Sequence, residues 1–106
     1  MAGLLLMFEE PDANTFDPVM FGVHRDGVIV QGPSVTATNA LPGIVTNIRL
    51  RIRGHGDRFT YEHSADGESW VMIRSDTLPG KVLMHAGLFC KDWSLPSALE
   101  VEFDYL

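Results

Sequence analysis

The strongest constraint on the fold is a strict two-residue alternation in residues 47–53, Asn-Ile-Arg-Leu-Arg-Ile-Arg. Successive side chains of a β-strand point to opposite faces, so Ile48, Leu50 and Ile52 share one face and three arginines share the other. We therefore predict a strand with one buried face. No stretch keeps the i, i+3, i+4, i+7 spacing of an amphipathic helix over three turns, and the predicted class is all-β.

Residues 58–63 carry a matching pattern, and we predict that the two segments form a hairpin. With Gly54–Asp57 as a four-residue loop, apolar residues meet on one face and Arg49 meets Glu62 on the other. That register pairs Arg53 with Arg58, Ile52 with Phe59, Leu50 with Tyr61, Arg49 with Glu62 and Ile48 with His63.

A second hairpin is predicted with Asp66-Gly67 at its tip, because this dipeptide tolerates the positive φ values of a type I′ turn. A two-residue turn directs Trp70 to the core. A bulge at Gly67 would instead bury Val71 and Ile73, and the sequence leaves both alternatives open. The pairs of the two-residue turn are His63 with Trp70 and Tyr61 with Met72.

Short apolar or alternating runs recur along the chain between clusters of Gly, Pro, Asp and Asn. Eight short strands fit a sandwich or a barrel, and we predict one antiparallel β-sandwich domain over residues 1–106. The predicted strands are Gly3–Phe8, Val19–His24, Val28–Gln31, Thr46–Arg53, Arg58–His63, Trp70–Arg74, Lys81–Phe89 and Leu99–Tyr105.

The last of these, Leu99–Tyr105, alternates as cleanly as the arginine strand but carries Glu100, Glu102 and Asp104 on its polar face. An arginine-faced and an acid-faced strand in one sheet would pair favourably, although each exposed pair contributes only about 0–1 kcal/mol. A glycosidase needs two carboxyl groups about 5–10 Å apart, which these acids could supply. Alternating acids on an exterior strand are commonly solvated surface residues without a catalytic role. We therefore predict that the chain is not an enzyme.

The charge balance argues against nucleic acid as a partner. The formal net charge is -6, from 14 acidic and 8 basic residues, and such a field repels phosphate backbones. The one cysteine, Cys90, ends an apolar run and is predicted to be buried, with no internal disulfide. This agrees with a reducing compartment, and we expect a cytoplasmic location.

The apolar start, Met1–Phe8, resembles the apolar segment of a signal peptide but lacks preceding basic residues and is followed at once by Glu9 and Glu10. We interpret it as a buried strand. No run approaches the roughly 20 apolar residues of a membrane helix, and no membrane association is expected.

Saccharide binding needs a flat aromatic surface for the sugar ring and planar polar groups for its hydroxyls. The predicted registers point Trp70 and Tyr61 to the core, so packing competes with binding there. Trp93 lies in the loop-like segment 91–96, and the sequence fits an exposed binding role and a packing role for it equally well. The arginine row could grip an acidic sugar or form a solvated face. The candidate ligand-binding residues are Trp93, Trp70, Tyr61, His63, Arg49 and Arg51.

No metal or other cofactor is predicted. Residues 12–17 offer three oxygen side chains but lack the glycine and the terminal glutamate of an EF-hand loop, which favours a plain turn. The four histidines are dispersed without the paired spacing of a zinc site; they are His24, His55, His63 and His85.

Several motifs together resemble the concanavalin A-like lectin/glucanase superfamily, and the match runs over roughly the whole chain. The sharpest element is the hairpin Ser64-x-Asp66-Gly67-x-x-Trp70. The others are Gly3-Leu4-Leu5-Leu6, Ile48-Arg49-Leu50-Arg51-Ile52, Ala86-Gly87-Leu88-Phe89 and Phe103-Asp104-Tyr105. The similar modules are jelly rolls that occur alone as small bacterial proteins of unknown function and at the C-terminus of family 43 glycoside hydrolases.

The resemblance implies a non-catalytic, carbohydrate-binding-like jelly-roll module with a saccharide ligand. The alternative is a protein–protein interaction or structural module that assembles through an open sheet, followed by a small glycoside hydrolase-like enzyme. Such modules usually have nearly twice this length and begin with further strands, so the sandwich is expected to be shortened at the N-terminus. An incomplete sandwich exposes an edge or an apolar face, and we predict a homodimer or higher homo-oligomer.

Overall fold

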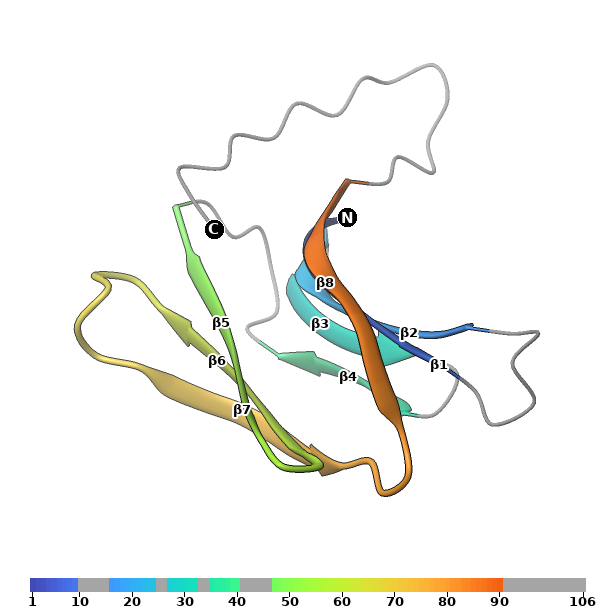
Figure 1. Ribbon diagram of the computed structural model, residues 1–106. Helices are drawn as coiled ribbons and strands as arrows, with labels where there is room; N and C mark the ends of the chain where they lie inside the picture. The colour runs from blue at the N-terminus through green and yellow to red at the C-terminus, as the bar shows by residue number, and fades with distance from the viewer. Residues whose placement is uncertain (10–15, 25–26, 33–34, 41–46, 91–106) are drawn as a thin grey trace, which may run out of the picture.

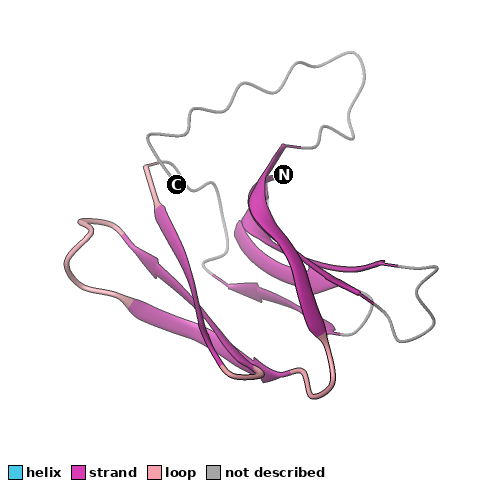
Figure 2. Cartoon of the chain, in the orientation of Figure 1, coloured by secondary structure: helices cyan, strands magenta, loops and turns pink. Residues whose placement is uncertain are grey.

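The computed structural model describes residues 1–9, 16–24, 27–32, 35–40 and 47–90, and every regular element among them is a strand (Figures 1 and 2). The predicted all-β class is confirmed. Among these residues, no helix is long and apolar enough to cross a membrane. The strands are β1 (Ala2–Glu9), β2 (Phe16–His24), β3 (Gly27–Gly32), β4 (Val35–Ala40), β5 (Arg49–His55), β6 (Arg58–Ser64), β7 (Val71–Thr77) and β8 (Val82–Cys90).

The strands form two antiparallel sheets of unequal width. The wider sheet has the order β4-β3-β2-β1-β8, and the narrower sheet has the order β5-β6-β7. In the wider sheet the first four strands follow one another as a meander, and β8 returns to pair with β1. Strand β1 is therefore paired on both sides, which suits its nearly unbroken apolar sequence.

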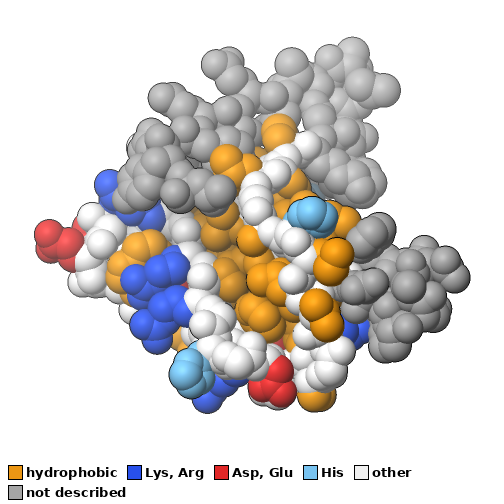
Figure 3. Space-filling model, viewed as in Figure 1, with side chains coloured by type: hydrophobic (Ala, Val, Ile, Leu, Met, Phe, Trp, Pro, Cys, Tyr) orange, Lys and Arg blue, Asp and Glu red, His pale blue; other side chains and the backbone are white. Residues whose placement is uncertain are grey.

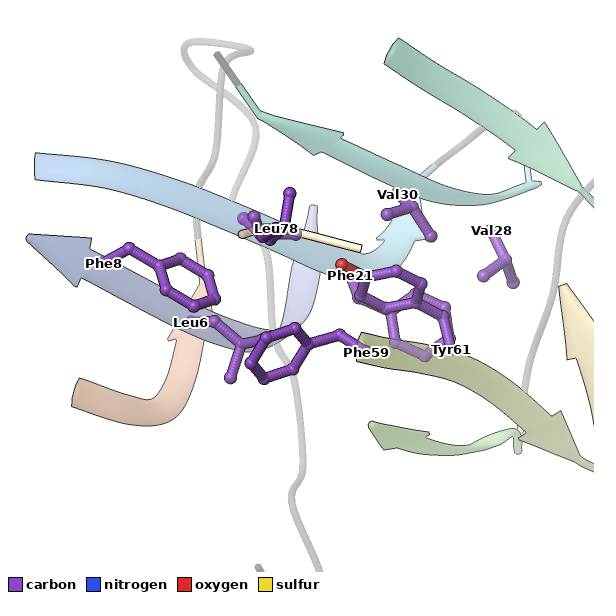
Figure 4. Close-up of a cluster of buried hydrophobic side chains, with 9 residues drawn as sticks. Leu6, Phe8, Phe21, Val28, Val30, Phe59, Tyr61 and Leu78 are labelled. Atoms are coloured by element: carbon purple, nitrogen blue, oxygen red, sulfur yellow. The ribbon is translucent and has the colours of Figure 1, made fainter. Parts of the chain in front are cut away.

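The two sheets share one apolar core (Figure 4). Alternate residues of the wider sheet meet the inward residues of β6, as the pleat of a strand requires. Phe8 meets Phe59 edge to face with ring centroids 5.2 Å apart, and Phe21 meets Tyr61 in the same way at 5.5 Å. The buried set is Leu6, Phe8, Val19, Phe21, Val28, Val30, Phe59, Tyr61 and Leu78.

The side chains of β5 alternate between the two faces of the narrower sheet. Ile48, Leu50 and Ile52 pack against the core, as predicted, while Arg49 and Arg53 are exposed on the opposite face. The expected strand start at Thr46 was too early, because Asn47 has φ +53° and cannot continue an extended strand.

The first hairpin has a two-residue loop, Gly56-Asp57, instead of the predicted four-residue loop. Gly56 has φ +62°, which a glycine at the first position of a tight hairpin turn adopts without strain. Arg51 consequently faces Glu62, and the predicted pairing of Arg49 with Glu62 was wrong. The register differs from the prediction by two residues, an even number, so every side chain keeps its predicted face.

Of the two alternatives that the sequence left open for the second hairpin, the register of the two-residue turn is wrong. His63 pairs with Val71, and a register shift between Tyr61 and Glu62 places Arg74 opposite Tyr61. The connection is longer than a two-residue turn because side-chain hydrogen bonds close a loop over residues 64–69. Ile73 packs against the core as in the alternative with a bulge, but Val71 is 55% exposed.

One strand, one cysteine and one predicted strand remain to be compared with the sequence. Strand β4 was not predicted, because its sequence Val-Thr-Ala-Thr-Asn-Ala has little apolar alternation; β4 pairs along the edge of β3. Cys90, predicted to be buried, is exposed at the end of β8, which is an edge strand among the described strands. The predicted strand Leu99–Tyr105 lies outside the described residues.

Close packing between β1 and β2 generates a stability prediction. Gly3 and Gly22 are opposite each other, and a methyl group on Gly22 would overlap the carbonyl oxygen of Ala2. We expect Gly22→Ala to lower the free energy of unfolding by about 1–3 kcal/mol, the usual cost of overpacking. Gly87→Ala is the matched control, because a methyl group there meets open space and should change stability by less than about 0.5 kcal/mol. Urea denaturation measures both, and equal effects would contradict this packing.

Candidate functional site

Glu62 organises the outward face of the narrower sheet. Its Oε2 is 2.6 Å from Nη2 of Arg51, and its Oε1 is 2.9 Å from Nε of Arg53. The guanidinium carbon of Arg51 lies 4.0 Å from the ring centroid of Trp70, within the range of a cation–π interaction. Glu62 is only 6% exposed although it points away from the core. We call Arg49, Arg51, Arg53, Glu62 and Trp70 the outer arginine cluster.

Arg49 belongs to this cluster through the loop that follows β6. Its Nη1 donates a hydrogen bond of 3.4 Å to the carbonyl oxygen of Ala65, and its side chain lies against Gly67. The φ of Gly67 is +81°, a value that lets the chain turn closely over the arginine. The arginine row predicted from the alternation of β5 is therefore anchored to the next hairpin.

The loop itself is closed by Ser64 and Asp66. The Ser64 hydroxyl oxygen accepts the backbone N–H of Gly67 at 2.8 Å and donates to Oδ1 of Asp66 at 2.9 Å. Oδ1 also accepts the backbone N–H groups of Glu68 and Ser69 at 2.8 and 2.9 Å. These backbone hydrogen bonds, first that of Ser69, lower the pKa of Asp66 to about 2. The motif is thus a self-contained turn, and this turn leaves Trp70 on the outward face.

The inward face of the same sheet carries a second polar group of residues. Tyr61 is fully buried, and Arg74 forms an ion pair with Asp76 beside it. Burial, and then the charge of Asp76, raise the pKa of Tyr61 far above its usual range, while Arg74 partly offsets this. Tyr61 therefore stays neutral inside the core.

The structure divides the six candidate ligand-binding residues between two faces. Arg49, Arg51 and Trp70 come together in the outer arginine cluster. Tyr61 and His63 belong to the inward face, where His63 is half-buried opposite Leu50. The sheet separates these two groups, so they do not line one binding surface. The remaining candidate, Trp93, lies outside the described residues.

A third feature is an apolar groove between the two sheets along β5 and β8; the sequence predicts an exposed edge or apolar face but does not locate it. Its volume is about 290 Å³, and Figure 3 shows apolar side chains gathered there beside the arginines of β5. The edge of β5 away from β6 and the edge of β8 away from β1 are both unpaired among the described strands. We call it the open groove; its lining residues are Leu4, Leu5, Leu6, Ile52, Gly54, Phe59, Leu83, Ala86 and Gly87.

The groove lies where, among the described residues, inward side chains of β8 are left exposed. Leu88 pairs with Leu4 and Leu83 pairs with Phe8, so both share the inward face of the wider sheet. They nevertheless stay 40% and 44% exposed. All nine groove-lining residues are uncharged, which suits an apolar occupant and offers no acid or base for catalysis. Within the described part of the chain, no three His, Cys, Asp or Glu residues gather in a way that could hold a metal ion.

These features define the class of the protein as an all-β protein in which two antiparallel sheets pack on a common core. Comparisons of the chain with protein-family models, with curated proteins and with solved structures find no match.

The hydrogen bonds to Asp66 predict a pH dependence. A depressed pKa in the folded state contributes stability above the unfolded pKa of 3.8, and this contribution is lost as the pH falls through about 2. The stability advantage of the wild type over Asp66→Asn should therefore shrink between pH 3.8 and about 2. A carboxyl titration by NMR should give a midpoint of about 2 for Asp66, and a midpoint near 3.8 would contradict the turn described here.

Proposed function

We propose that this chain is a non-catalytic β-sandwich module that acts through protein–protein contact at the open groove. The observation that carries this proposal is the exposure of Leu83 in the open groove, and of Leu88 further along the inward face of β8, where β5 has an edge unpaired among the described strands. Soluble proteins seldom leave an apolar groove and an unprotected strand edge together unless a partner covers them.

The partner that fits is an extended polypeptide segment added to the free edge of β5. Main-chain hydrogen bonds to β5 would hold it, as in other cases of strand addition. A strand at this position would lie over β8, and its inward side chains would cover Leu83 and Leu88. Its outward side chains would lie beside Arg49 and Arg53. The structure therefore favours a partner strand that alternates apolar and acidic residues.

A jelly-roll topology and a concanavalin A-like relationship belong to the same proposal, and the two antiparallel sheets with one open side support them. The homodimer or higher homo-oligomer expected from the sequence would be self-association through this groove. Light scattering at micromolar concentration separates that arrangement, which gives a multiple of 11.7 kDa, from a monomer that is open to another partner.

Saccharide binding is the second candidate, and the outer arginine cluster favours it. Trp70 supplies an aromatic ring, and Arg49 and Arg51 supply planar donors. Arg51 covers one face of that ring, however, and Tyr61 and His63 are on the other side of the sheet. A glycan array followed by calorimetry tests this candidate: binding that Trp70→Ala abolishes would support it and would displace the groove as the functional surface.

The groove proposal is tested with a labelled nine-residue peptide that alternates Val and Glu. Leu83→Asp puts a charge on the inward face of β8 and should weaken peptide binding about tenfold or more in fluorescence anisotropy. Val82→Asp is the matched control, since Val82 pairs with Glu9 on the opposite face, and it should leave binding unchanged. A peptide that alternates Val and Lys should bind more weakly because of the arginines. Failure of the Val/Glu peptide to bind any variant of the chain, or equal effects of the two substitutions, would refute the proposal.

A further inference from the structure

The chain itself contains a segment with the chemistry that the open groove requires. Residues 99–105, Leu-Glu-Val-Glu-Phe-Asp-Tyr, alternate apolar and acidic residues without interruption, and they lie outside the described residues. Among the described strands, the polar face of β5 instead carries arginines. A strand with acids on one face and apolar side chains on the other therefore matches both the arginines of β5 and the apolar lining of the open groove.

Length and tether agree with this match. At about 3.3 Å per residue, a seven-residue strand spans the same length as β5, which also has seven residues. Strand β8, which lines the groove, ends at Cys90, and the eight residues between Cys90 and Leu99 could span up to about 26 Å if fully extended. A short tether also gives the segment a local concentration in the millimolar range, which a free partner must exceed.

The charge of the outer arginine cluster also favours an acidic strand beside β5. Arg49, Arg51 and Arg53 carry three positive charges and Glu62 carries one negative charge, so the cluster has an excess of two positive charges. Arg49 makes its hydrogen bond to a neutral carbonyl oxygen. Acids at alternate positions of a neighbouring strand would lie beside these guanidinium groups, where opposite charges across a sheet contribute favourably.

We propose that residues 99–105 are the resident occupant of the open groove, added to β5 as a fourth strand of the narrower sheet. Leu99, Val101, Phe103 and Tyr105 would cover Leu83 and Leu88, while Glu100, Glu102 and Asp104 would lie beside the arginines. An external partner strand then binds by displacing this segment, which makes the segment an intramolecular competitor. This inference rests on the proposed function of the groove.

Hydrogen exchange on the full chain tests the occupant directly. If a strand is bonded to the free edge of β5, amides along Arg49–His55 are protected in the wild type at consecutive residues. Phe103→Asp should then remove protection at every second amide, those that point away from β6, and leave the others unchanged. Protection confined to alternate amides already in the wild type would overturn the proposal. Loss of protection along β6 as well would mean general unfolding and would also count against it.

Competition is tested with the Val/Glu peptide. Glu102→Lys should weaken the resident strand beside the arginines and raise the affinity of the peptide about tenfold. Glu68→Lys makes the same charge change in the exposed loop after β6, and it should alter the affinity by less than twofold. Equal affinity of the wild type and Glu102→Lys would refute the inference but leave the groove as a binding surface. No binding by any variant would refute the proposed function itself.

Light scattering tells whether the strand in the groove comes from the same chain or from a second copy. A monomeric wild type that remains monomeric in Glu102→Lys agrees with an occupant from the same chain. A wild-type dimer that Glu102→Lys dissociates would show that a second copy supplies the strand, and it would overturn the intramolecular arrangement.

Discussion

The structure depends on edge-to-face contacts between aromatic rings of the two sheets. Phe8 of β1 meets Phe59 of β6, and Phe21 of β2 meets Tyr61 of the same strand. Aromatic pairs of this geometry contribute about 0.5–1.5 kcal/mol beyond the burial of their area. Because both contacts involve β6, they centre the narrower sheet over β1 and β2. The place where that sheet ends determines which part of the wider sheet stays uncovered.

Among the described residues, the three strands of the narrower sheet do not cover all five strands of the wider one, and inward side chains of β8 stay exposed. Leu83 and Leu88 point inward but remain exposed, and β5 keeps a free edge beside them. The polar face of β5 adds positive charge to that edge, since Glu62 neutralises only part of it. Shape, apolarity and charge thus converge on one kind of occupant, a strand with apolar and acidic residues in alternation.

Sequence reasoning succeeded where local pattern decides the structure. The alternation around Leu50 predicted the all-β class and the buried face of β5, because a period of two residues determines which way a side chain points. Pairing distances depend on turn geometry, so Gly56 and the side-chain hydrogen bonds of Asp66 shifted both hairpin registers beyond what propensity could predict. The position of Trp70, which the sequence left open, was undetermined for the same reason. The groove arises from the widths of two sheets, a property of the assembled fold that no local motif encodes.

A double-mutant cycle on Phe21 and Tyr61, with leucine at each position so that the core stays apolar, tests whether these rings hold the two sheets together. We expect the two substitutions to be coupled by about 0.5–1.5 kcal/mol in the free energy of unfolding, because the rings touch across the two sheets. Additivity within about 0.3 kcal/mol would mean that the rings do not meet, and it would contradict the packing on which the open groove depends.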